Sequence, residues 1–126
     1  MKKIITTVDA PAPIGPYNQA VQHGDTIFLS GQIALDPATM TLVNGTIKEE
    51  TEQVMQNLAA VLKAAGSDLS KVIKTTIFLS DMDYFQEVNE VYGSHFDEAI
   101  APARETVAVR TLPKSVNVEI AMIAHV

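Results

Sequence analysis

The sequence lacks cysteine altogether in its 126 residues. Disulfide bonds, thiolate nucleophiles and cysteine-ligated metal sites are therefore excluded. A chain without cysteine fits the reducing environment of the cytosol, and we expect a cytoplasmic protein.

Basic residues are scarce, with 9 Lys and Arg against 15 Asp and Glu, so the net charge is -6. Nucleic-acid binding draws its affinity from basic side chains that neutralise phosphates, and we expect no nucleic-acid partner. Long apolar runs are also missing. The N-terminal stretch is interrupted by Thr6, Thr7 and Asp9, well short of the roughly 20 apolar residues of a membrane span. We expect neither a signal peptide nor a membrane partner.

Familiar cofactor and nucleophile motifs are absent. His23, His95 and His125 are far apart and show no metal-ligand spacing. There is no G-x-S-x-G motif, no glycine loop that cradles phosphate and no G-x-G-x-x-G motif. We therefore expect no metal and no cofactor, and an enzyme of this sequence would act without either.

The length and composition favour one folded domain over residues 1–126. Hydrophobic residues make up 47% of the chain and charged residues 19%. That apolar share is high for so small a domain, which indicates that another subunit covers part of the surface. We expect an oligomer.

Hydrophobic periodicity separates strands from helices. A helix is predicted from 48 to 65, ended by Gly66, and a second from the capping signal at 80–83 to Phe96. The predicted strands span 2–8, 17–22, 26–35, 40–43, 72–79, 102–110 and 116–126. This order predicts an α+β two-layer sandwich, with two helices on one face of a sheet and the last two strands adjoining at a proline turn.

The other face of the sheet is mixed in character. Strand alternation assigns to it Ser30, Gln32, Thr76, Thr106, Ala108 and Arg110. It assigns Ile73, Ile77 and Leu79 to the core face. A mixed face is typical of a partly wet contact between subunits, and we expect clefts there.

Two charged residues in the last quarter of the chain are candidates for chemistry. Arg104 lies two residues after Pro102 and shares a strand face with Thr106, and its planar fork of donors suits a carboxylate. Glu119 is a lone carboxylate in an apolar run, where it can hold a water molecule or act as a general base. The alternative for both is structural: an ordinary ion pair for Arg104 and a salt bridge for Glu119.

Four polar residues are candidates for lining a ligand site. Ser30 and Gln32 lie on the mixed strand face, Asn89 falls within the apolar stripe of the second helix, and Tyr17 follows a rigid Pro-Gly-Pro loop. Each has a structural alternative as a satisfied buried polar group or, for Tyr17, a packed aromatic.

Six motifs in this order together resemble the YjgF/RidA family of enamine and imine deaminases, over nearly the whole chain. The motifs are Ile14-Gly15-Pro16-Tyr17, Phe28-Leu29-Ser30-Gly31-Gln32-Ile33, Val88-Asn89-Glu90-Val91-Tyr92, Pro102-Ala103-Arg104, Leu112-Pro113-Lys114 and Val118-Glu119-Ile120.

The resemblance implies a chorismate-mutase-like fold with a mixed, mostly antiparallel sheet. It also implies a homotrimer with ligand sites between subunits, and cofactor-independent hydrolysis of 2-iminobutanoate and 2-iminopropanoate to 2-keto acids and ammonia. By the same resemblance, Arg104 binds the substrate carboxylate and Glu119 positions the attacking water. Tyr17, Ser30 and Asn89 line the site, and Gly31 and Thr106 contribute backbone hydrogen bonds.

This sequence departs from the family pattern at Glu105, at Thr106 and at His95, the last standing where an aromatic is usual. Strand alternation points Glu105 away from the face of Arg104. Two alternatives to the enzyme remain: a non-catalytic protein that binds 2-keto acids or other small carboxylates, and a ribonuclease. The acidic charge balance argues against the ribonuclease.

Overall fold

Six strands form one sheet in the computed structural model, which describes residues 1–126. The order across the sheet is β1-β2-β3-β6-β4-β5. All neighbouring pairs are antiparallel except β4 and β5, which run parallel. The strands are β1 (Lys2–Ile5), β2 (Ala20–His23), β3 (Thr26–Gln32), β4 (Val72–Leu79), β5 (Ala103–Ala108) and β6 (Val118–His125). The predicted mixed, mostly antiparallel sheet is confirmed.

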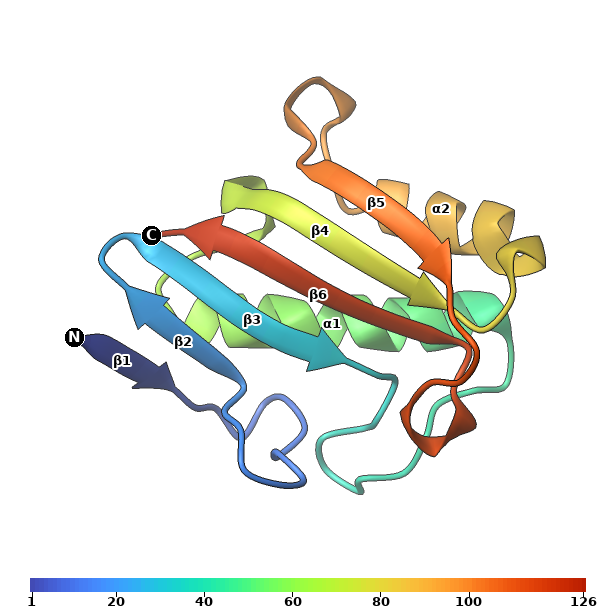
Figure 1. The fold of residues 1–126 in the computed structure, drawn as a ribbon, viewed down its shortest axis with the longest axis horizontal. Coiled ribbons are helices and arrows are strands. Elements are labelled where there is room, and N and C mark those ends of the chain that lie inside the picture. Colours follow the sequence, from blue (N-terminus) through green and yellow to red (C-terminus); the bar gives the residue numbers. More distant parts are fainter.

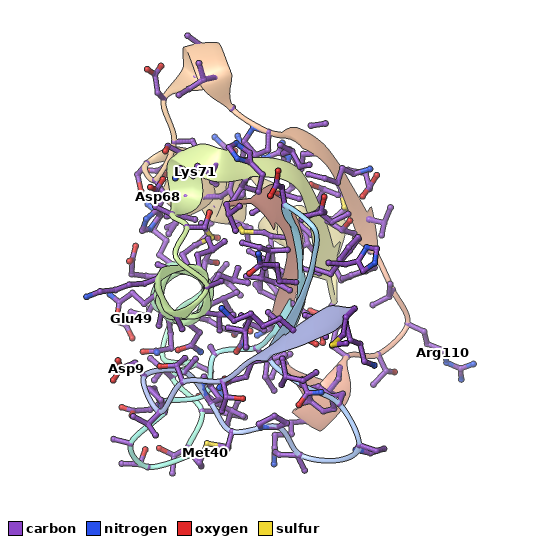
Figure 2. All side chains as sticks on the ribbon, turned by 90° about the vertical axis from the view of Figure 1, so that its left-hand side faces the viewer. Asp9, Met40, Glu49, Asp68, Lys71 and Arg110 are labelled. Carbon is purple, nitrogen blue, oxygen red and sulfur yellow. The ribbon has the colours of Figure 1, made fainter.

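Two helices, α1 (Ile47–Ala64) and α2 (Phe85–Gly93), cover one face of the sheet and leave the other bare (Figure 1). The side chain of Thr46 caps α1 by accepting a hydrogen bond from the backbone N–H of Glu49. Gly66, with a φ of +76°, follows the helix in the left-handed conformation that glycine adopts most readily. Seen along α1, the helix and the curved sheet form separate layers (Figure 2). The α+β two-layer sandwich is confirmed, and no helix is both long and apolar enough to cross a membrane.

Short turns account for the differences in length between the predicted and observed helices. The second helix was predicted to reach Phe96, but α2 ends at Gly93 and the chain continues in turns. Asp81 caps a separate 3-10 turn ahead of α2, where its side chain accepts from the N–H of Asp83. The four 3-10 turns are Leu69–Lys71, Met82–Tyr84, Glu98–Ile100 and Pro113–Ser115.

The core lies between α1 and the covered face of the sheet. The buried stripe of α1 packs against buried strand residues because both surfaces present branched apolar side chains toward one another. Fully buried members include Val54, Met55, Leu58, Leu62, Ile27, Ile77, Leu79, Val118 and Ile120.

Two irregularities overturn parts of the predicted strand faces. Between Leu29 and Gln32, β3 has two residues opposite one of β6, a bulge that returns Gln32 to the buried side instead of the mixed face. A register shift at the start of β4 leaves Ile73 exposed, although it was predicted to be in the core, and buries Val72. Alternation counted along a sequence cannot detect such shifts.

Several predicted strand bounds were also wrong. The segment 40–43 makes only an isolated bridge, between Leu42 and Leu35. Residues 17–19 belong to the loop before β2, and β3 ends at Gln32. The last two strands do not adjoin, because β4 lies between β5 and β6.

Candidate functional site

Glu119 faces a cavity on the bare side of the sheet. It pairs in register with Phe78 of β4, and the buried residues on either side of it, Val118 and Ile120, point toward the helices. The cavity has a volume of about 460 Å³, and Tyr17, Ser30, Gly31 and Glu119 are among the residues that line it. Of the predicted site residues, these four are therefore brought together.

Burial raises the pKa of the Glu119 carboxyl above its usual range. The carboxylate makes no salt bridge, so no cation compensates for the lost solvent. The structural alternative of a salt bridge is therefore not found within this chain. A half-buried carboxylate with a raised pKa is suited to accept a proton from water and to return it.

Gly31 makes room for that carboxylate. A Cβ atom at Gly31 would lie 2.8 Å from Oε2 of Glu119, closer than Cβ atoms come to other atoms in proteins. The β3 bulge includes Ser30 and Gly31 and thus turns the strand backbone toward Glu119. Ser30 donates from its hydroxyl to the carbonyl of Asn18 at 2.6 Å, which fixes its rotamer at the cavity wall.

The proline loop that carries Tyr17 is held by Gln19, a residue that the sequence did not single out. The amide oxygen of Gln19 accepts from the N–H of Thr7 at 2.7 Å, and its nitrogen donates to the carbonyls of Thr7, Ala10 and Pro11. Tyr17 is half exposed, and its hydroxyl accepts from the N–H of Ile14. A lone glutamine beside a loop gives no sequence signal for this role.

Glu50 anchors the chain just before Glu119 and was also missed. It is 1% exposed, and its carboxylate accepts hydrogen bonds from the backbone N–H of Asn117 at 2.8 Å, from the Asn117 side chain at 3.1 Å and from the N–H of Val118 at 2.9 Å. These bonds satisfy the oxygens of a buried carboxyl group with hydrogen-bond donors instead of a cation. They connect the first turn of α1 to the start of β6 and so fix the position of the backbone just before Glu119.

Arg104 lies on the other side of the sheet. In the parallel β4–β5 ladder it pairs with Thr75, which is fully buried beneath the helices. Its Nη1 donates to Oδ1 of Asn89 at 2.7 Å, and its guanidinium carbon lies 5.1 Å from the ring centre of Tyr92 and 5.7 Å from that of Phe85. Such cation–π contacts hold a guanidinium in place while its free donors remain available.

A second cavity, of about 540 Å³, opens in front of Arg104. Its lining residues are Asn89, Tyr92, Gly93, Phe96, Glu98, Ala101, Pro102 and Arg104. Arg104 forms no salt bridge, so the alternative of an ordinary ion pair is not found within this chain. The aromatic side chains beneath the arginine were not assigned from the sequence, because their spacing in α2 is that of a core stripe.

Thr106 was predicted on the mixed face, and that prediction was wrong. It pairs with Ile77, a core residue, and therefore lies on the helix side together with Arg104. Its hydroxyl oxygen is buried and has no hydrogen-bond partner. Buried hydroxyls normally have one, so this oxygen is available to a group arriving beside Arg104.

Glu105 points away from Arg104, as strand alternation predicted. It pairs in register with Thr76 on the bare face, where its carboxylate binds Lys74 Nζ at 2.9 Å and accepts a hydrogen bond from the Thr76 hydroxyl. The Thr76 hydrogen bond and the lysine hold the pKa of Glu105 below its usual range. This departure from the family pattern therefore leaves the guanidinium unobstructed.

The predicted residues thus form two half-sites separated by the sheet. The Glu119 half-site is the cavity lined by Tyr17, Ser30, Gly31 and Glu119, and the Arg104 half-site is the cavity lined by Asn89 and Arg104, with Thr106 on the same side. Within one chain, a small molecule cannot touch Arg104 and Glu119 at once. No three histidine, aspartate or glutamate side chains gather as a metal-ligand set.

Comparison with known proteins places the chain among proteins of similar length and the same fold. It matches the family described as Endoribonuclease L-PSP over residues 7–126. It is 48% identical to the 2-iminobutanoate/2-iminopropanoate deaminase of Mus musculus, over 98% of this chain and 91% of that protein. The chain is a member of the YjgF/RidA family.

Solved structures of YjgF/RidA proteins superpose closely on this one. A putative endoribonuclease from Thermotoga maritima is 52% identical with a TM-score of 0.96, covering 100% of this chain and 98% of that one. E. coli TdcF, solved with bound serine, is 40% identical with a TM-score of 0.92, covering 98% of each chain. The names of these YjgF/RidA relatives point to different substrates. The substrate of this chain must therefore be inferred from its own site.

Proposed function

We propose that the protein hydrolyses 2-imino acids to 2-keto acids and ammonia, at sites completed between the subunits of a homotrimer. The observation that carries this proposal is the Glu119 half-site: a cavity containing a half-buried carboxylate of raised pKa with no counter-ion. The mouse relative named as an imine deaminase supports the reaction type. The substrates proposed are 2-iminopropanoate and 2-iminobutanoate, the tautomers of 2-aminoacrylate and 2-aminocrotonate.

In this proposal Arg104 binds the substrate carboxylate. One guanidinium nitrogen is engaged with Asn89, and the ring of Tyr92 supports the plane of the group. The donors that remain suit the two oxygens of a carboxylate. The unpartnered hydroxyl of Thr106 adds a further polar group on the same side. These contacts orient the imine carbon.

Glu119 acts on the water molecule. It accepts a proton as the water oxygen attacks the iminium carbon, which forms a tetrahedral carbinolamine. The protonated carboxyl then returns the proton to the nitrogen. As the C–N bond breaks, the carboxylate accepts the proton of the carbinolamine hydroxyl, which becomes the carbonyl of the keto acid, and passes that proton to the departing ammonia. The iminium carbon is already electrophilic, so positioning and proton transfer supply most of the catalysis.

The homotrimer joins the half-sites. The bare face of the sheet carries exposed apolar side chains, among them Phe28 and Val107, which are 49% and 42% exposed. A second copy covering this face would bury them and bring its own Arg104 toward the Glu119 cavity. Each site would then take its arginine from one subunit and its glutamate from the next.

The assay that tests the reaction generates 2-aminocrotonate in situ with a threonine dehydratase and follows release of 2-oxobutanoate. Adding the protein should accelerate release above the spontaneous rate. No acceleration, combined with tight binding of 2-oxobutanoate in calorimetry, would instead favour a small-carboxylate binding protein. The bound serine in E. coli TdcF gives that second candidate its support.

The ribonuclease suggested by the family description is tested separately. The net charge of -6 opposes phosphate binding, and we propose that nucleic acid is not a partner. Salt-sensitive binding of RNA by the purified protein would contradict this.

Mixing two inactive variants tests the shared site. Arg104→Ala and Glu119→Gln subunits, co-refolded in equal amounts, should regain about a quarter of wild-type activity. Roughly one subunit interface in four then combines an intact Arg104 from one chain with an intact Glu119 from the other. The measurement is keto-acid release before and after mixing. If activity stays at the level of the separate variants, each site belongs to a single chain.

Substituting Gly31 by alanine tests the close approach to Glu119. The added methyl group must displace a carboxylate that lies 2.8 Å away, so keto-acid release should fall by about tenfold or more. Affinity for 2-oxobutanoate should change less than turnover, since Arg104 is unaffected. A Gly31→Ala protein with wild-type turnover would show that the position of Glu119 is not critical.

A further inference from the structure

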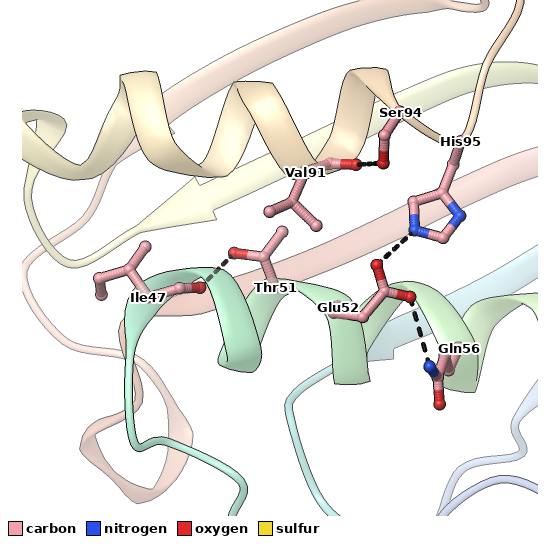
Figure 3. A network of polar contacts seen from close by, with 7 residues as sticks. All are labelled: Ile47, Thr51, Glu52, Gln56, Val91, Ser94 and His95. Carbon is pink, nitrogen blue, oxygen red and sulfur yellow. Dashed lines mark hydrogen bonds and ion pairs between the residues drawn. The ribbon is translucent and has the colours of Figure 1, made fainter.

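His95 connects the turn after α2 to α1. Its Nε2 lies 2.8 Å from Oε1 of Glu52, and the other oxygen of that carboxylate accepts a hydrogen bond from Gln56 at 3.3 Å. Figure 3 shows the imidazole reaching from the end of α2 to these α1 side chains. A separate contact, the Lys48–Glu90 ion pair between α1 and α2, is more exposed, with side chains 50% and 67% accessible against 23% for His95 and 40% for Glu52. The contact of His95 is therefore the better protected of the two.

The residue after His95 belongs to the surroundings of Arg104. The Phe96 ring lies 4.7 Å from the Tyr92 ring, and Tyr92 supports the guanidinium of Arg104. The hydroxyl of Tyr92 donates to Thr75 at 3.0 Å, which fixes one end of this pair of rings. We call Tyr92 and Phe96 the aromatic platform.

The Phe96 end of the platform lies outside the regular helix. Beyond Gly93 the backbone is held by turn hydrogen bonds, from the N–H of His95 to Tyr92 at 3.1 Å and from the N–H of Phe96 to Gly93 at 3.2 Å. The only side-chain hydrogen bond that ties this turn to another element is the one between His95 and Glu52. Losing it would leave the turn without a side-chain hydrogen bond to another element, so that packing alone would hold Phe96 beside Tyr92.

We propose that His95, by binding Glu52, fixes the aromatic platform, whose Tyr92 ring lies beneath Arg104, and so sets the affinity of the site for the substrate carboxylate. This inference rests on the proposed function. His95 does not line the Arg104 cavity and is a positioning residue. It acts by restricting the arginine before the ligand arrives, because a side chain that is already ordered loses less entropy on binding.

This role predicts an effect on binding and not on the chemical step. His95→Ala should weaken binding of 2-oxobutanoate, measured by calorimetry, by about threefold to tenfold, the range expected for one lost hydrogen bond. The KM for 2-iminobutanoate in the dehydratase-coupled assay should rise by the same factor, with kcat unchanged. Glu52→Ala removes the other partner and should give the same shift.

Two further variants separate positioning from general stability. His95→Gln retains a donor that can reach Glu52 and should restore wild-type affinity. Lys48→Ala breaks the exposed ion pair between α1 and α2 and should leave affinity unchanged. Thermal unfolding of each variant reports stability independently.

Three results would overturn the inference: wild-type affinity in both His95→Ala and Glu52→Ala, equal weakening in Lys48→Ala, or no recovery in His95→Gln. A wild-type protein that does not bind 2-oxobutanoate would also overturn it. If 2-oxobutanoate binds and depends on His95 but imines are not hydrolysed, the proposed function fails and the inference stands.

Discussion

Replacing Arg104 by alanine should lower kcat/KM for imine hydrolysis by about 10²–10³-fold, since two charge-assisted hydrogen bonds of roughly 1.5–2 kcal/mol each are lost. Affinity for 2-oxobutanoate should fall by a similar factor, because the product presents the same carboxylate. The measurements are keto-acid release in the dehydratase-coupled assay and calorimetry with the keto acid.

Two controls sharpen this result. Arg104→Lys keeps the charge but loses the planar fork, so it should fall between wild type and alanine. Arg110→Ala removes a nearby arginine that lines neither cavity and extends away from the rest of the molecule in Figure 2, and it should behave as wild type. An Arg104→Ala protein as active as wild type would reject the assignment of the carboxylate site.

Replacing Glu119 by glutamine should lower kcat by about 10²–10⁴-fold, the usual contribution of a general base, and spare binding of 2-oxobutanoate. The amide keeps the shape of the side chain but cannot take the proton of the attacking water. Loss of turnover with retained binding of 2-oxobutanoate identifies an enzyme. A binding protein has no turnover for Glu119→Gln to remove. Calorimetry and the coupled assay on the same preparation make this comparison.

The raised pKa of Glu119 sets the sign of the pH dependence. Only the ionised form accepts a proton, so wild-type kcat/KM should fall as the pH decreases through this raised pKa, and at a higher pH than an ordinary glutamate would give.

The same pKa affects folding stability, because the native state favours the protonated carboxyl of Glu119. The stability due to that preference is present at low pH and is lost as the pH rises through the folded pKa. Glu119→Gln should therefore be at least as stable as wild type at neutral pH.

Local sequence patterns predicted most of the fold. The stripe from Val54 to Leu62 and the glycine after it defined α1, and β4 was predicted with its observed bounds. These features depend on neighbours within a few residues, whose periodicity or turn chemistry is visible in the chain. The orientation of Glu105 relative to Arg104 was predictable for the same reason, since adjacent strand residues point to opposite faces.

The arrangement of the site was less predictable because it depends on pairing between distant segments. Whether Arg104 and Glu119 share a face is decided by the registers of β5 and β6 against β4, and these place the two residues on opposite sides. The bulge at Ser30 and Gly31 likewise exists only against β6. The anchoring role of Glu50 was hidden because its donors come from residues 67 and 68 positions further along the chain.

The separation of the two half-sites by the sheet has a consequence for how the protein responds to its own concentration. A lone chain contains both Arg104 and Glu119, yet under the proposed function it holds no complete site. Activity per chain then follows mass action: it is constant while the trimer persists and falls on dilution below the dissociation constant of the subunits. A keto acid that binds the assembled form more tightly than the lone chain would promote reassembly.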